Sequence, residues 1–98
     1  MSASKEQIHQ DLQGILSNFQ GRQYTAEIGL DTQFFGGLGL VSIDAVVLGE
    51  TLENYYGTPI PFHEFLAELR EEEVEDIEVG RLVEFLYHVL AADRYRHS

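Results

Sequence analysis

One serine of this chain, Ser42, stands where a glycine-rich run meets the start of an apolar helical pattern. The three glycines of residues 34–41 (FFGGLGLV) remove side-chain bulk from the approach to its hydroxyl. A helix N-terminus offers unpaired backbone N–H groups and the positive end of the helix dipole, so a phosphate ester on Ser42 would be stabilised there. The pattern favours a phosphate ester on Ser42 if one is attached or, alternatively, indicates a serine that only caps the helix.

The other residue types that could do chemistry form no recognisable site. The four histidines, at 9, 63, 88 and 97, lack metal-binding spacing. The glutamates at 71–73 and 75 lack the spacing of a calcium loop. Glu50 and Glu53 are one helical turn apart, but no nucleophile or base accompanies them, so they are interpreted as surface acids. We therefore expect no enzymatic activity and no bound metal.

Length and composition predict one small domain that covers residues 1–98. The chain has no cysteine, which excludes disulfides and thiolate metal sites. No apolar run approaches the roughly 20 residues that span a bilayer, and the N-terminus lacks the layout of a signal peptide. We expect a soluble, cytoplasmic protein without membrane association.

The chain is strongly acidic, with a formal net charge of −11. That charge argues against binding to nucleic acid and to anionic membranes, which both require Lys and Arg. No Lys or Arg occurs between Arg22 and Arg70, and Ser42 lies within this gap. Two interpretations stay open: a docking field for basic surfaces of partner enzymes, or an acidic surface kept for solubility.

Hydrophobic periodicity predicts an all-α fold with three long helices and one short one, because strand-like alternation is missing throughout. The expected helices cover residues 6–19, 42–56, 61–69 and 79–90, with Ser4 as first N-cap and Gly57 as the stop of the second helix. Residues 93–98 are expected to form a frayed tail.

A long, glycine-rich loop over residues 22–41 separates the first two helices. A loop of this length in a small domain is usually functional or packed on the core. A short helical turn is expected at Asp31-Thr32. The apolar side chains expected to fold back onto the core are Tyr24, Ile28, Leu30, Phe34, Phe35 and Leu38.

The second helix has two apolar faces. Ala45, Leu48 and Leu52, with Tyr55 or Tyr56, form the stripe expected to be buried. A different face carries Ile43, Val46, Val47 and Glu50, and Val47 is expected to be largely exposed. Three apolar residues on an outer face indicate a contact patch for a partner.

Residues 38–44 (LGLVSID) resemble the attachment site of acyl carrier proteins, in which a Leu-Gly pair precedes an Asp-Ser-Leu or Asp-Ser-Ile triplet. Residues 28–35 (IGLDTQFF), 52–61 (LENYYGTPIP) and 76–83 (DIEVGRLV) are similar to other parts of that family. The resemblance covers nearly the whole chain. One residue departs from it, because Val41 stands where the family has the aspartate associated with recognition by the transferase.

The resemblance implies a four-helix bundle of the acyl-carrier type. It also implies 4′-phosphopantetheine, derived from coenzyme A, bound covalently to Ser42 and holding acyl groups as thioesters. Such an arm raises the effective concentration of the tethered substrate at each partner. The pathway implied is fatty acid, polyketide or related secondary metabolism. The alternative is a carrier-like interaction module that stays unmodified because of Val41.

The implied partners are a phosphopantetheinyl transferase, an acyl-loading enzyme, and a ketosynthase or other acyl-processing enzymes, with the carrier itself a monomer. We assign docking of these partners to the exposed side of the second helix. The docking residues predicted are Ile43, Asp44, Val46, Val47, Glu50 and Glu53.

Overall fold

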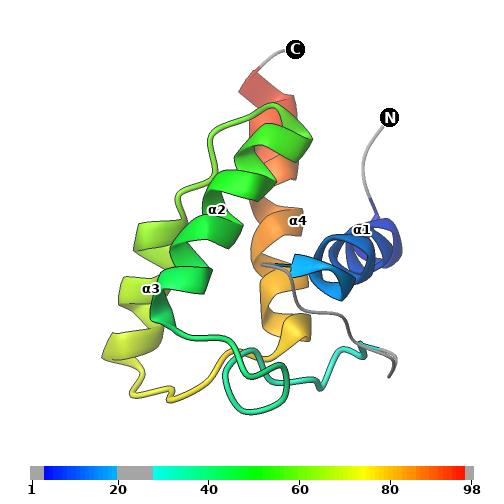
Figure 1. Cartoon of the computed structure of the whole chain (residues 1–98). Helices are drawn as coiled ribbons and strands as arrows, with labels where there is room; N and C mark the ends of the chain where they lie inside the picture. Colours follow the sequence, from blue (N-terminus) through cyan, green and yellow to red (C-terminus); the bar gives the residue numbers. More distant parts are fainter. Residues whose placement is uncertain (1–3, 20–27, 97–98) are drawn as a thin grey trace. The chain divides into compact units, whose positions relative to one another are not determined.

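The computed structural model describes residues 4–19 and 28–96, with side chains described as far as residue 91. This part of the chain is helical and contains no strand (Figure 1). The helices are α1 (Lys5–Ser17), α2 (Ser42–Tyr56), α3 (Phe62–Glu71) and α4 (Val79–Arg96). The predicted all-α class with four helices is confirmed. The chain forms two compact units, residues 33–77 and the two flanking segments 1–32 and 78–98.

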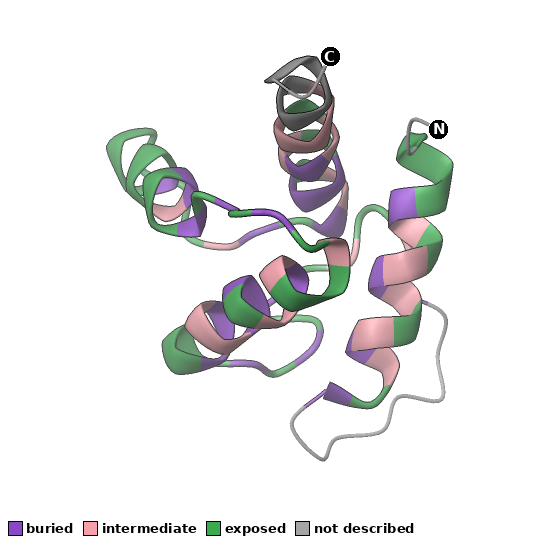
Figure 2. Cartoon of the chain, turned by 90° about the horizontal axis from the view of Figure 1, so that it is seen from above, coloured by how far each residue is buried: buried purple, intermediate pink, exposed green. Residues whose placement is uncertain are grey.

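The unit formed by the flanking segments is built on α1 and α4, which pack against each other. Ser4 is the N-cap of α1, as predicted, and its hydroxyl accepts the Gln7 N–H at 3.1 Å. Buried residues recur along one face of each helix (Figure 2). They are Ile8, Leu12 and Leu16 of α1 and Val79, Leu82, Val83 and Leu86 of α4.

The ends of three helices differ from the prediction. Helix α1 ends at Ser17, although Phe19 beyond it is buried. Helix α3 continues to Glu71, where a charged link was expected. Helix α4 continues to Arg96, so the predicted tail is helical over residues 93–96. Charged residues after the last apolar position do not by themselves end a helix, so hydrophobic periodicity alone places the ends of α3 and α4 too early.

The loop before α2 packs as predicted at most of its apolar positions. Ile28, Phe34 and Leu38 are buried, and Phe35 is half-buried. Leu30 was expected to be buried and is 52% exposed. Its backbone carbonyl accepts the Gly80 N–H at 2.7 Å, so the main chain is fixed while the side chain points outward. Asp31-Thr32 forms a turn and not a helix, and Tyr24 lies outside the described residues.

The unit of residues 33–77 contains residues 33–41 of the loop, together with α2 and α3. Helix α2 has the predicted bounds and ends at Gly57, whose φ of 67° is left-handed. Ala45, Leu48 and Leu52 are buried, Tyr56 is half-buried and Tyr55 is 56% exposed, so Tyr56 continues the stripe. Helix α3 buries Phe62, Phe65 and Leu69. A Cβ on Gly49 of α2 would lie 3.0 Å from the Phe62 Cβ, so this glycine lets the two helices approach closely.

Candidate functional site

Ser42 is the first residue of α2. The N-cap is Val41, with extended backbone angles of φ −121° and ψ 176°. Ser42 therefore does not cap α2, and the capping interpretation of this serine is wrong. Its side chain is exposed at the N-terminal end of a 15-residue helix, where backbone N–H groups and the helix dipole favour an anion.

Asp44 stabilises this helix start from within the first turn. Its carboxylate accepts the Val41 N–H at 2.8 Å, and its own N–H donates to the Val41 carbonyl at 2.9 Å. This is half of a capping box, because the valine side chain has no oxygen to reciprocate. Asp44 is buried, so the carboxylate predicted to face partners is turned toward the backbone.

The loop before Ser42 consists of consecutive hydrogen-bonded turns. The Gln33 carbonyl accepts the N–H groups of Gly37 and Leu38, both at 2.9 Å. A Cβ on Gly37 would lie only 2.6 Å from that carbonyl oxygen, so this position requires glycine for space. Gly39 has a φ of 70°, which glycine adopts without strain. Of the three glycines before Ser42, Gly39 is thus the one with a positive φ.

Asp76 binds this loop from the segment that precedes α4. One of its carboxylate oxygens accepts the Phe35 and Ile77 N–H groups at 2.8 and 2.7 Å, and the other accepts the Gly36 N–H at 2.8 Å. Partial burial raises the pKa of this carboxyl, but the backbone N–H groups outweigh burial and hold the pKa below its ordinary value. No sequence pattern distinguishes Asp76, because its loop partners, Phe35 and Gly36, lie about forty residues away in the chain.

The predicted docking residues differ in how far they are accessible. Val41 and Ile43, which flank Ser42, are 54% and 63% exposed. Glu50 is exposed, whereas Val46 and Val47 are half-buried, so the expectation of a largely exposed Val47 is wrong. The face of a helix that packs against the core is about 100° wide or wider, so the positions next to the buried stripe are partly covered as well.

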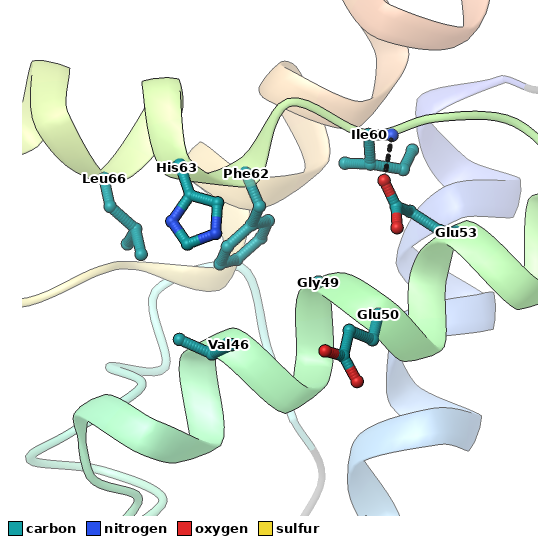
Figure 3. A pocket seen from close by; sticks show the side chains of 8 residues that line it. All are labelled: Val46, Gly49, Glu50, Glu53, Ile60, Phe62, His63 and Leu66. Atoms are coloured by element: carbon teal, nitrogen blue, oxygen red, sulfur yellow. Dashed lines mark hydrogen bonds between the residues drawn. The ribbon is translucent and has the colours of Figure 1, made fainter.

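A small pocket lies between α2 and α3, about one helical turn beyond Ser42 (Figure 3). Its volume is about 180 Å³. Glu53, which borders it, is half-buried, and its carboxylate accepts the Ile60 N–H at 2.9 Å. This bond ties the α2–α3 connection to α2, so Glu53 has a structural role beside its predicted docking role. The lining residues are Val46, Gly49, Glu50, Glu53, Ile60, Phe62, His63 and Leu66.

The described residues contain neither a metal-binding cluster nor a membrane-spanning helix. No group of three or more His, Cys, Asp or Glu side chains there is arranged to hold a metal ion. None of the described helices combines the length and apolarity needed to cross a membrane.

Residues 10–71 match the sequence pattern of the family described as "Phosphopantetheine attachment site". No curated protein and no solved structure matched the chain. Because the match covers more than half of the chain and spans the loop, α2 and α3, the protein belongs to this family of carrier domains. Domains of this family carry the site at which 4′-phosphopantetheine is covalently attached, so the cofactor predicted from the sequence is confirmed.

The residues at the start of α2 fit such a group. Ser42 is exposed and stands at a helix N-terminus, where backbone N–H groups and the helix dipole favour a phosphate. The role of the chain is therefore that of a phosphopantetheine carrier. Carrier domains of this family interact with phosphopantetheinyl transferases and with acyl-processing enzymes.

Proposed function

We propose that Ser42 is the residue that receives 4′-phosphopantetheine, and that the protein carries acyl intermediates as thioesters on this arm. The observation that carries the proposal is the exposed Ser42 as the first residue of α2, within the matched residues 10–71. The protein catalyses no reaction itself. Its partners belong to fatty acid, polyketide or related secondary metabolism, and the protein works as a monomer in the cytoplasm.

The surface around Ser42 supports docking that depends mainly on apolar contact. Val41 and Ile43 are more than half exposed on either side of the serine. The nearest carboxylate in the sequence, that of Asp44, is buried against the backbone of Val41. Glu50, two turns further along α2, is exposed and supplies an acidic contact. A partner with an apolar surface near its active site and a basic residue beyond it fits this arrangement.

Labelling by a transferase tests the proposal. Incubation with coenzyme A and a broad-specificity phosphopantetheinyl transferase should add the mass of one phosphopantetheine group to the folded protein. Ser42→Ala should remain unlabelled. Ser17→Ala is the matched control, because Ser17 lies on α1 and its hydroxyl donates to the Gly14 carbonyl at 3.0 Å. It should be labelled like the wild type.

The alternative is an unmodified carrier-like interaction module, favoured by Val41 in place of the family's aspartate. It predicts that the folded protein stays unlabelled by several transferases while still binding a partner through α2. Labelling on a residue other than Ser42 would contradict the assignment of the site but not the carrier role.

A further inference from the structure

We infer that Asp76 is a positioning residue for the modification of Ser42. It holds the loop before α2 in the conformation in which a transferase meets the serine. The inference rests on the proposed role of Ser42, and it adds a residue that lies outside α2.

The contacts of Asp76 are directed at the loop. Two of the three N–H groups that its carboxylate accepts belong to Phe35 and Gly36, both at 2.8 Å. A carboxylate that accepts backbone N–H groups forms charge-assisted bonds, which are roughly twice as strong as neutral ones. The fit is close, because a Cβ on Gly36 would lie 3.1 Å from the nearer Asp76 oxygen. Asp76 therefore fixes the main chain of the loop at Phe35 and Gly36.

The loop transmits this position to Ser42 through its own hydrogen bonds. The Gly39 N–H donates to the Phe35 carbonyl at 3.0 Å, and the Leu40 N–H donates to the Phe34 carbonyl at 3.3 Å. The side chains of Phe34, Leu38 and Leu40 are buried, which anchors the same segment from the other side. Only Val41 separates this anchored segment from Ser42.

Loss of the Asp76 contacts should make the loop adopt several conformations, of which a fraction presents Ser42 correctly. The apparent affinity of a partner falls by that fraction, while turnover of the bound complex is unchanged. The signature of positioning is thus a raised KM for the carrier with an unaltered kcat. General destabilisation of a protein that stays folded at the assay temperature moves neither constant.

The experiment measures the KM and kcat of labelling by a broad-specificity transferase and coenzyme A for wild type, Asp76→Asn and Asp76→Ala. Asparagine keeps one acceptor oxygen, so it retains part of the contacts, whereas alanine removes all of them. We expect KM to rise about threefold for Asp76→Asn and about tenfold for Asp76→Ala, with kcat unchanged. Amide hydrogen exchange at Phe35 and Gly36 should accelerate in the same order.

Ser4→Ala is the matched control, because it removes a side-chain acceptor of a backbone N–H on α1 and leaves the loop intact. It should lower the melting temperature without changing KM. A wild-type KM for Asp76→Ala, or for Asp76→Asn if the alanine variant does not fold, would overturn the inference alone. Absence of labelling in the wild type would overturn the role of Ser42 and this inference together.

Discussion

Replacing Gly37 with alanine should destabilise the loop that leads to Ser42. The new Cβ would lie 2.6 Å from the Gln33 carbonyl oxygen, so one of the two groups must retreat by about 0.8 Å to reach ordinary contact. That oxygen accepts the N–H groups of Gly37 and Leu38, both at 2.9 Å. A retreat of this size lengthens both bonds beyond hydrogen-bond distance. At about 0.5–1.5 kcal/mol for each bond, the free energy of unfolding should fall by about 2 kcal/mol.

Thermal unfolding followed by circular dichroism measures this loss. For a domain of this size, about 2 kcal/mol corresponds to a melting temperature lower by roughly 8–16 °C. Gly14→Ala is the control, because Gly14 lies inside α1 and its Cβ would meet nothing within 4 Å. It should raise the free energy of unfolding by about 0.5–1 kcal/mol. A Gly37→Ala protein as stable as wild type would refute the close packing of the loop.

Three further predictions concern the helix start, the helix face and the carboxylate. Val41→Asp supplies the missing cap acceptor, so it should stabilise the protein by about 0.5–1 kcal/mol and speed labelling by a standard transferase; equal or slower labelling would show that Val41 does not limit modification. Val47→Glu, at a half-buried position, should lower the free energy of unfolding by about 1–2 kcal/mol and weaken acyl transfer to a partner enzyme. Leu48→Glu, at a buried position, should unfold the protein, and unfolding by both variants would contradict the register of α2. Because the pKa of Asp76 is lowered on folding, the ionised carboxylate stabilises the folded protein fully at pH values above the ordinary pKa of 3.8, and this stabilisation is lost as the pH falls further. The Asp76→Asn variant should lack this contribution, so identical acid-unfolding curves for wild type and Asp76→Asn would contradict the prediction.

Local patterns were sufficient to predict the helix that carries the site. The apolar spacing of α2 and the stop at Gly57 gave its bounds, because both signals lie within the helix or directly after it. The position of Ser42 at a helix start followed from the same signals. The orientation of Asp44 had a local signal too, since an acid at the third helical position often reaches back to the cap N–H. The docking role predicted for Asp44 does not use this signal.

No local sequence signal predicts the hydrogen bonds between Asp76 and the loop. Its partners are backbone N–H groups about forty residues away, and backbone groups leave no mark in a sequence. The half-buried state of Val47 could not be predicted from the sequence either, because it depends on how far neighbouring segments cover the edge of the buried stripe of α2. Contacts between segments that are distant in the sequence thus hold the loop before Ser42, and local patterns do not reveal them.

Intact-mass measurement of the protein purified from its native host, with fragmentation to locate the modified residue, tests the central claim most directly. We predict a population heavier by one phosphopantetheine group, with or without an acyl group, and with the added mass on Ser42. Protein of unmodified mass from cells in which its partner enzymes are produced would contradict it.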